Sequence, residues 1–454
     1  MTKKKYNLSV FGCQMNERDA ETLRGFLEEM GYEESAKTEN ADLVIINTCA
    51  VRQKAEDKVF GLIGRLGKLK KDRPEMMIAI CGCMVQQEGV ARKLIRKHPF
   101  VDLVFGTHNI AAFPVLLQRA AESSEPLLDL WAEAGDVVEG LPVSRKDGVR
   151  AWVNITYGCN NYCAYCIVPY VRGRERSRHP AEIMDEINDL ARQGYQEVTL
   201  LGQNVNSYGK DLGEQFDFSD LLQQVDREGG INRIRFMTSH PRDWHEKLAR
   251  VIAEGTNICE HVHLPLQSGS NRILALMNRG YTREHYLAQV EILRRHLPDC
   301  AISTDLIVGF PGETEEDFLA TLEIVEQVSY DAAFTFLYSQ RSGTPAAKMP
   351  AQIGSEVKRE RFKRLLEIQN RHSLHHNLQL VGKTVEVLVE GKSKTNPAVL
   401  SGRTRGGKTV NFAGEDVRAG DLLQVEISEA KTWSLLGRIN VENRNTNDQA
   451  VQGD

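Results

Sequence analysis

The chain has 454 residues, enough for about three domains of ordinary size, which excludes a small disulfide-stapled scaffold. No apolar run approaches the roughly 18 residues that a membrane span needs, and the basic start at 1–5 lacks the apolar stretch of a signal peptide, so we expect a cytoplasmic protein without membrane contact. The net charge of -5 excludes a broad basic surface, so any nucleic-acid binding needs local patches.

The first third of the chain alternates short β-branched runs with amphipathic segments. This alternation predicts a parallel α/β domain, which we expect over residues 4–120. A connector rich in Pro, Ser and Glu, at about 120–147, would end it. The expected strands are 6–11, 42–46, 77–80 and 101–105, and the expected helices are 16–30, 52–69 and 86–97.

A second alternating series predicts a partial (β/α)6 barrel over residues 145–375. It contains six strand candidates, which is too few for the eight units of a complete barrel. Barrels of this kind work at the carboxyl edge of their strands, so functional residues are expected directly after each strand. The strand candidates are 151–156, 197–201, 233–237, 261–266, 303–308 and 333–338.

After a charged helix at 355–380, the pattern changes to short strands separated by turns that contain glycine. A small β-barrel is expected over 378–441, so the fold class is α/β with an all-β addition. Residues 442–454 are polar and nearly free of apolar side chains, and this tail is predicted to be disordered.

Three of the nine cysteines, Cys159, Cys163 and Cys166, follow the first barrel strand in one loop with CxxxCxxC spacing. The cytosol keeps thiols reduced, so clustered cysteines point to metal or redox chemistry rather than to disulfides. A structural zinc site is the alternative, but it normally has four ligands, and no second pair of cysteines accompanies this loop. An iron–sulfur cluster held by three cysteines leaves one iron open to a small chelating molecule.

A second set of cysteines is dispersed along the first domain. Cys13, Cys49 and Cys83 each lie after a predicted strand and before a helix, at separations of 36 and 34 residues. All three would therefore emerge at the carboxyl edge of one parallel sheet, where such sheets place their ligands. They are candidates for a second cluster, and buried small apolar residues are the alternative. Cys81, Cys259 and Cys300 are expected to belong to the core.

These residues resemble those of the radical-SAM methylthiotransferase family. The cysteine loop matches the family motif in which the open iron binds S-adenosylmethionine, and Tyr165 occupies the aromatic position beside the last cysteine. The segments 12–16, 47–52 and 82–84 are similar to the family's N-terminal domain, and the last barrel is similar to its RNA-binding TRAM domain. The resemblance implies two 4Fe–4S clusters, one on each set of three cysteines.

Further cofactor or substrate contacts are implied by three segments that resemble strand-end motifs of the family, at 200–205, 263–270 and 305–314. Each residue in question could instead stabilise its own loop. The implied contacts are Gln203, Asn204, Gln267, Arg279 and Asp305.

The resemblance leaves three substrates open: N6-dimethylallyladenosine in tRNA, threonylcarbamoyladenosine in tRNA, and an aspartate of a ribosomal protein. The segments 11–16, 169–178 and 238–243 look like those of the dimethylallyladenosine (MiaB-type) enzymes, so methylthiolation of carbon 2 of that nucleoside beside the anticodon is the expected function. A non-catalytic iron–sulfur protein that senses through its clusters and binds RNA is the non-enzyme alternative. A sensor gains nothing evident from an open iron.

Local basic patches suit an RNA partner. Between Lys358 and Lys408 the chain holds twelve basic and four acidic residues, although a solvated helix face explains the helical part of this stretch equally well. RNA phosphates near a single-stranded loop are the expected ligands of such patches. The candidate RNA contacts are Arg172, Arg174, Arg176, Arg178, Arg403 and Arg405.

The implied reaction uses S-adenosylmethionine twice, once as methyl donor and once as radical source. The expected partners are the tRNA anticodon stem-loop, an electron donor and a sulfur donor, and we expect a monomer. No side-chain acid or base is assigned, because the chemistry belongs to the clusters.

Overall fold

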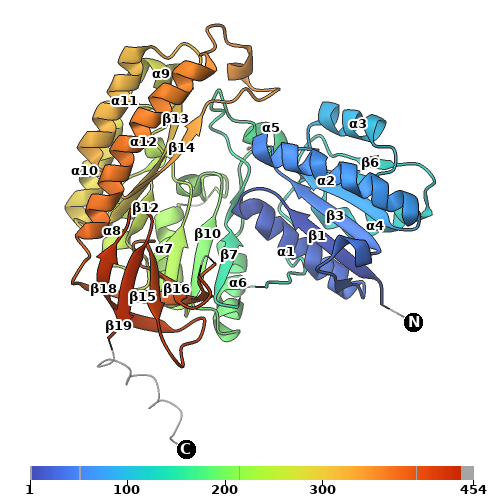
Figure 1. The fold of residues 1–454 in the computed structure, drawn as a ribbon, viewed down its shortest axis with the longest axis horizontal. Helices are drawn as coiled ribbons and strands as arrows, with labels where there is room; N and C mark the ends of the chain where they lie inside the picture. Colours follow the sequence, from blue (N-terminus) through green and yellow to red (C-terminus); the bar gives the residue numbers. More distant parts are fainter. Residues whose placement is uncertain (1–2, 51–52, 147, 214, 395, 441–454) are drawn as a thin grey trace, which may run out of the picture.

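The computed structural model describes residues 3–50, 53–146, 148–213, 215–394 and 396–440, so the predicted disordered tail lies outside the described residues. Figure 1 shows an N-terminal α/β unit beside a central half-barrel, with a small β-barrel beneath the latter. The predicted α/β class with a C-terminal all-β unit is confirmed. Within the described ranges, no helix is both long and apolar enough to cross a membrane.

The N-terminal unit is built on a six-stranded parallel sheet in the order β2-β1-β3-β4-β5-β6. The chain order reverses direction between β1 and β3, and open sheets bind ligands beyond the carboxyl ends of the strands at such a point. The elements are β1 (Lys5–Val10), α1 (Gln14–Glu29), β2 (Glu33–Glu34), β3 (Leu43–Thr48), α2 (Gln53–Asp72), β4 (Met77–Gly82), α3 (Glu88–Lys97), β5 (Leu103–Phe105), α4 (Phe113–Glu122) and β6 (Leu127–Asp129).

Helices cover both faces of this sheet, because its strands carry apolar side chains on both sides. Residues of α1 and α4 pack on one face with alternate strand residues such as Leu43 and Ile45, and Cys81 lies in this core. Residues of α2 and α3 pack on the other face with Val44 and Ile46.

The central unit contains the six predicted parallel strands, arranged as β7-β10-β11 and β12-β13-β14. A bridge between Ile234 and Ile258 joins the two halves. No described strand pairs with the outer edges of β7 or β14, so the barrel stays open there. The strands are β7 (Arg150–Asn154), β10 (Glu197–Leu201), β11 (Arg233–Phe236), β12 (His261–His263), β13 (Ala301–Val308) and β14 (Ala332–Leu337). The helices are α5 (Val168–Arg172), α6 (Pro180–Arg192), α7 (Phe218–Glu228), α8 (Glu246–Glu254), α9 (Asn271–Leu276), α10 (Arg283–His296), α11 (Glu315–Val328) and α12 (Ser355–Leu378).

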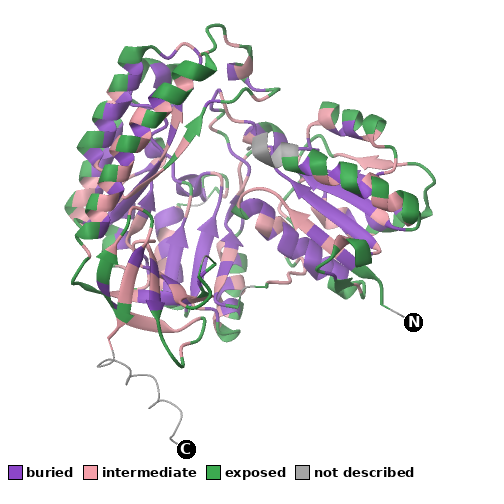
Figure 2. Cartoon of the chain, viewed as in Figure 1, coloured by how far each residue is buried: buried purple, intermediate pink, exposed green. Residues whose placement is uncertain are grey.

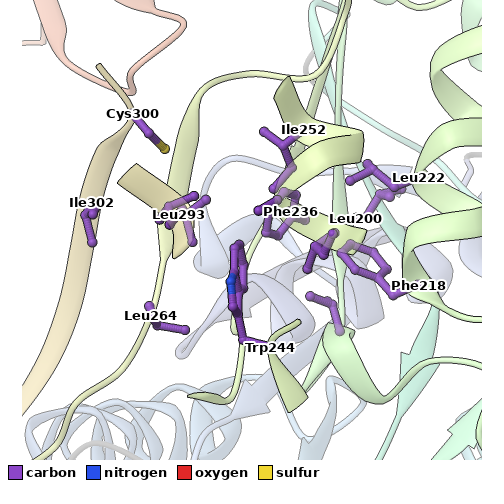
Figure 3. Close-up of a cluster of buried hydrophobic side chains, with 14 of the residues drawn as sticks. Leu200, Phe218, Leu222, Phe236, Trp244, Ile252, Leu264, Leu293, Cys300 and Ile302 are labelled. Carbon is purple, nitrogen blue, oxygen red and sulfur yellow. The ribbon is translucent and has the colours of Figure 1, made fainter. Parts of the chain in front are cut away.

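The largest apolar core lies between these strands and their helices (Figure 3). Phe218 of α7 packs edge-on against Phe236 of β11, with ring centroids 5.3 Å apart. Asp217 fixes the start of α7, because its carboxylate accepts hydrogen bonds from the backbone N–H groups of Ser219 and Asp220, at 2.8 and 3.1 Å. Cys300 belongs to this core.

The C-terminal unit is a closed five-stranded barrel in the order β15-β16-β17-β19-β18. Alternate inward-facing residues, among them Val387, Phe412 and Ile427, fill its interior. The strands are β15 (Thr384–Lys392), β16 (Leu400–Thr404), β17 (Thr409–Ala413), β18 (Leu422–Ala430) and β19 (Leu435–Ile439).

This barrel docks against the N-terminal edge of the half-barrel. Arg233, the first residue of β11, is fully buried and donates hydrogen bonds to the Glu386 carboxylate of β15 at 2.7 Å and to the Arg403 carbonyl at 2.6 Å. Arg405 pairs with Glu260, which precedes β12, at 2.7 Å. The small barrel thus occupies the starts of the parallel strands and leaves their carboxyl ends free.

Candidate functional site

The loop with the CxxxCxxC spacing follows the short strand β8 (Thr156–Tyr157), at the carboxyl edge of the half-barrel. The N–H of Cys159 donates to the Gly173 carbonyl at 3.2 Å, and the N–H of Cys166 donates to the Cys163 carbonyl at 2.9 Å. Gly158 has φ +73°, and a Cβ there would lie 2.1 Å from the Arg174 carbonyl oxygen, so only glycine fits this turn. The loop is thereby folded with its three cysteines close together.

Burial controls the chemistry of these thiols. It raises the pKa of Cys159 to about 11 and that of Cys166 to about 12, and the other cysteines of the loop add to both shifts. Buried thiols with raised pKa values, such as Cys159 and Cys166, ionise together only if a cation compensates their charges, as an iron–sulfur cluster does. The buried Arg279 also supplies positive charge, because its Nη1 donates to the Cys163 Sγ at 3.2 Å.

The structure places Cys13, Cys49 and Cys83 directly beyond the carboxyl ends of β1, β3 and β4, where the sheet order reverses. Cys83 is held by its N–H, which donates to the Thr48 carbonyl at 2.9 Å. Burial raises the pKa of Cys83 to about 12, and charges on Cys49 and Cys13 would raise it further, so the three thiols share one environment.

Two buried asparagines tie this edge together. The side chain of Asn16 donates to Asn47 Oδ1 at 3.1 Å and to the Thr48 carbonyl at 3.0 Å. In return, the Asn47 side chain donates to the Asn16 carbonyl at 2.9 Å. These bonds fix the segment after β1, which carries Cys13, against the end of β3.

The short helix α5 links the two sets of cysteines, because it begins two residues after Cys166 and lies at the junction with the N-terminal unit in Figure 1. Cys83 packs in one small apolar cluster with Ile167 and with Val171 of α5. The Thr107 hydroxyl, from the N-terminal unit, donates to the Val171 carbonyl at 2.5 Å. The helix that follows one set of cysteines therefore packs against Cys83 of the other set.

The charge of Arg172, the last residue of α5, is buried beside Cys83 and Cys13. Its partner is Asp19 of α1, at 2.6 Å. The positive charge of Arg172 lowers the pKa of Cys83, against the larger effect of burial. A fixed guanidinium at this position favours an anionic group on the three cysteines.

Neither set forms a site for a single metal ion. Among the described residues, no three His, Cys, Asp or Glu side chains lie close enough together to hold one ion. A zinc site would need its sulfurs within about 2.3 Å of one centre, whereas the ligands of a cluster bind separate irons. Each set offers three cysteines, which suits a cluster with one open iron better than a structural zinc site, which normally has four ligands.

The predicted cofactor contacts fall into three places. Tyr165 packs edge-on against Phe310 at 6.5 Å, and burial is the largest cause that raises its pKa, which the nearby Arg279 lowers. Gln267 has φ +69°, and its N–H donates to the Asp305 carbonyl at 2.8 Å. Asn204 lies apart from these, because its side chain donates to Asp243 at 2.7 Å, and Gln203 is half-buried beside it.

A group of polar residues lies at the carboxyl ends of β7, β10 and β11; Asn204 was among the predicted contacts, whereas Asn154, Asn206, Ser239 and His240 were not. These side chains are buried and carry polar atoms without a hydrogen-bond partner in the described part of the chain, namely Asn154 Oδ1, Asn204 Oδ1, both side-chain atoms of Asn206, Ser239 Oγ and His240 Nε2. Buried polar atoms are almost always paired, so this group fits a polar ligand with amine, carboxylate and hydroxyl groups, as S-adenosylmethionine has. The motif 238–243 was the available signal, but it was interpreted only as a mark of substrate type.

Within this polar group, burial and a nearby positive charge keep the imidazole of His240 neutral. Burial lowers the pKa of His240 to about 2, and the positive charge of Arg279 lowers it as well. The effect of Arg279 places His240 near the guanidinium that contacts Cys163. Because Nδ1 of this neutral imidazole accepts a hydrogen bond from the Arg242 backbone N–H at 3.3 Å, its Nε2 carries the proton and can donate to a ligand.

The six arginines expected to bind RNA are used differently in the structure. Arg172 and Arg178 are buried and paired, Arg172 with Asp19 and Arg178 with Glu139 and Glu186, so both side chains form ion pairs inside the protein. Carboxylates already neutralise their charges, which spacing in the sequence cannot reveal. Of the remaining four, Arg174 is exposed, Arg176 donates to the Gly135 carbonyl, Arg403 pairs with Glu390, and Arg405 pairs with Glu260.

Comparison with family models covers all three units. Residues 153–325 match the Radical SAM superfamily, residues 5–106 match Uncharacterized protein family UPF0004, and residues 378–439 match the TRAM domain. The first match implies a 4Fe–4S cluster and S-adenosylmethionine at the half-barrel.

Curated relatives match nearly the whole chain. A tRNA-2-methylthio-N(6)-dimethylallyladenosine synthase of Desulforamulus reducens is 54% identical over 436 residues, which cover 96% of this chain and 95% of that protein. A synthase of the same name from Alkaliphilus oremlandii is 55% identical over 436 residues, with coverage of 96% and 93%.

A solved structure supports the fold. The radical S-adenosylmethionine methyltransferase TsrM from Kitasatospora setae superposes with a TM-score of 0.57 at 16% identity, over 76% of this chain and 75% of that chain. At this identity the likeness concerns the arrangement of the units alone.

Proposed function

This chain belongs to the tRNA-2-methylthio-N(6)-dimethylallyladenosine synthase family, and from that premise we propose that it adds a methylthio group to carbon 2 of N6-dimethylallyladenosine beside the anticodon in tRNA. The observation that carries the proposal is that α5, which begins two residues after Cys166, packs through Val171 against Cys83 of the second cysteine set. A substrate base that reaches both sides of this helix would meet a radical source and a sulfur source together.

Radical SAM chemistry, when its cluster and S-adenosylmethionine are bound, supplies the radical that activates an otherwise inert carbon. Cys159, Cys163 and Cys166 would hold that cluster, and a second 4Fe–4S cluster would bind Cys13, Cys49 and Cys83. Arg172 would balance the negative charge of the second cluster, and the polar group around Asn206 and His240 would hold S-adenosylmethionine.

The protein's own part is to position these groups and to exclude water. The apolar residues around α5, Ile167 and Val171, are buried between the two cysteine sets. The exposed Arg174 lies just beyond them, where it would meet RNA phosphate, and the TRAM barrel would add affinity for the tRNA anticodon stem-loop. An electron donor and a sulfur donor complete the proposed partners, and a cytoplasmic monomer remains our prediction.

The test is mass spectrometry of nucleosides from tRNA that lacks the methylthio group, after anaerobic incubation with the reconstituted protein, S-adenosylmethionine and a reductant. We expect a methylthio gain on dimethylallyladenosine. A methylthio gain only on threonylcarbamoyladenosine or on a ribosomal-protein aspartate would change the assigned substrate and keep the proposed chemistry. RNA binding without any release of 5′-deoxyadenosine would support the non-catalytic sensor instead.

A further inference from the structure

Two phenylalanines, Phe334 and Phe336, are exposed on β14, at 52% and 41% of their surfaces. Figure 2 shows this strand ending in exposed residues, although it belongs to the same half-barrel as strands that are buried along their length. Exposed rings side by side on an ordered strand form the kind of apolar surface that usually marks a binding site.

The strand register places both rings on the inner face of the half-barrel. Phe334 pairs with Asp305 of β13, and Phe336 pairs with Ile307. The intervening residues of β13, such as Leu306, are buried in the core under the helices. Because side chains alternate along a strand, the paired set faces the opposite way, into the open barrel.

The aromatic surface continues to the cysteine loop. Tyr338, directly after β14, packs against Phe310 with ring centroids 5.5 Å apart, and Phe310 packs against Tyr165 of the loop at 6.5 Å. Phe336 is thus two residues along the strand from a chain of rings that ends beside Cys166. A molecule on this face would lie in the compartment that opens toward the candidate radical source.

The polar groups around the rings fit the edge of a base better than a phosphate. The ring of His263 contacts that of Phe334 at a centroid distance of 5.7 Å, and its Nε2 lies 3.5 Å from Asp305 Oδ1. The Asp305 side chain keeps 28% exposure. A carboxylate repels phosphate but accepts a hydrogen bond from an exocyclic N–H, and aromatic faces stack on any base.

We infer that Phe334 and Phe336 form the platform on which the target adenine stacks, with Asp305 accepting a hydrogen bond from its N6–H group. This inference rests on the proposed function, since it names the protein surface that holds the proposed substrate base. It assigns the two rings to substrate recognition rather than to the protein core.

The test compares two synthetic anticodon stem-loop RNAs that differ only at the target position, one with dimethylallyladenosine and one with an abasic site. Their dissociation constants are measured by fluorescence anisotropy with the full chain, both clusters rebuilt anaerobically and S-adenosylmethionine present. For the wild type we expect the abasic RNA to bind about tenfold more weakly, which is within the range for stacking on aromatic side chains. In Phe334→Ala and Phe336→Ala this ratio should fall toward 1.

Conservative variants separate stacking from simple packing. Phe336→Tyr keeps a flat ring and should keep the ratio, whereas Phe336→Leu keeps apolar volume without a ring and should lose it. Phe60→Ala is the matched control, because Phe60 is an exposed ring on α2 in the N-terminal unit, at 39% exposure. It should leave the ratio unchanged.

Three outcomes would overturn the inference: a wild type that binds both RNAs equally, a ratio that both alanine variants leave intact, or full retention by Phe336→Leu. Variants that weaken only the binding of S-adenosylmethionine, measured by equilibrium dialysis, with the ratio intact would also overturn it and assign the rings to the cofactor. The wild type could bind the RNA with dimethylallyladenosine more tightly than the abasic RNA and yet never methylthiolate it. That result would support the stacking platform and refute the proposed function.

Discussion

Cys163 and Cys49 are both buried thiols, but they belong to different units of the fold. Cys163 contacts Arg279 in the half-barrel, and Cys49 lies beyond β3 in the N-terminal sheet. We expect Cys163→Ala to abolish 5′-deoxyadenosine formation and Cys49→Ala to leave some formation but no methylthiolation, because only the first would hold the iron that binds S-adenosylmethionine. Quantifying both products by mass spectrometry checks this.

Two other cysteines provide the controls for that experiment. Cys259 and Cys300 are buried, and Cys300 lies in the core under α10. Cys259→Ala and Cys300→Ala should keep the full iron content. Equal 5′-deoxyadenosine formation by the wild type and Cys163→Ala, or iron loss in either control, would contradict the assignment of ligands.

Gly158 allows a second test at the scale of one residue. Gly158→Ala forces a Cβ to within 2.1 Å of the Arg174 carbonyl oxygen at φ +73°, so the cysteine loop must shift. We expect the iron content to fall by about half, since one of the two proposed clusters would be affected. Gly194→Ala has a comparable φ of +89° but no atom within 4 Å, so it should keep its iron, and similar losses in both variants would refute the steric explanation.

Among the elements, those with long or regular apolar patterns were the predictable ones. The six half-barrel strands and the small barrel match their predicted positions, because β-branched runs and turn residues mark them directly. The edge strands β2 and β6 were not predicted, because strands of two or three residues are too short to show an alternating apolar pattern. β6 lies in the stretch predicted as a connector. The cysteine positions followed from the strand ends, whereas the polar group around Asn206 needed the folded structure.

Docking between elements was the least predictable feature. The guanidinium of Arg233 and the carboxylate of Glu386 lie 153 residues apart in the chain, and no local pattern connects them. Likewise, nothing in the sequence distinguishes the buried Arg178 from the exposed Arg174. Long-range charge pairs of this kind depend on packing that only the complete fold provides.

The docking of the small barrel is open to a direct test. Arg233→Met leaves the Glu386 carboxylate and the Arg403 carbonyl without their donor, which should cost about 2–3 kcal/mol of unfolding free energy, reduced from the value for a fully buried pair because Glu386 is partly exposed. Urea unfolding measures the loss, and limited proteolysis should cut between α12 and β15. Arg418→Met, at an exposed site on the same barrel, should change neither result.

For the whole molecule, a buried network of charges joins the N-terminal unit to the half-barrel. Glu186 of α6 accepts hydrogen bonds from Arg18 of α1 at 3.2 Å and from Arg178 at 2.6 Å, and it also pairs with Arg145 of the connector. Burial alone would raise the pKa of Glu186, but the three arginines hold it at about 2. This carboxylate therefore stabilises the fold above pH 4.5, and that contribution is lost as the pH falls from 4.5 toward 2.

Glu21 of α1 belongs to the same network but is poorly paired. Its carboxylate lies 3.7 Å from Arg18 and 3.4 Å from Arg145, and burial raises its pKa to about 7 against the attraction of those arginines. The folded state therefore binds a proton between pH 4.5 and 7 that the unfolded state has released, so stability decreases as the pH rises through this window.

Glu21→Gln replaces the carboxylate with a neutral group of the same shape, so it should remove this loss. The shift from 4.5 to about 7 corresponds to about 3 kcal/mol, so the variant should be more stable than the wild type by up to that amount at pH 8 and equal to it near pH 4.5. Glu186→Gln should be destabilised at pH 8, because it leaves three arginines without their shared partner. Urea unfolding of both variants at the two pH values measures this. A Glu21→Gln variant that is less stable at pH 8 would show that Glu21 acts as an ionised partner of Arg18 and Arg145, as Glu186 does.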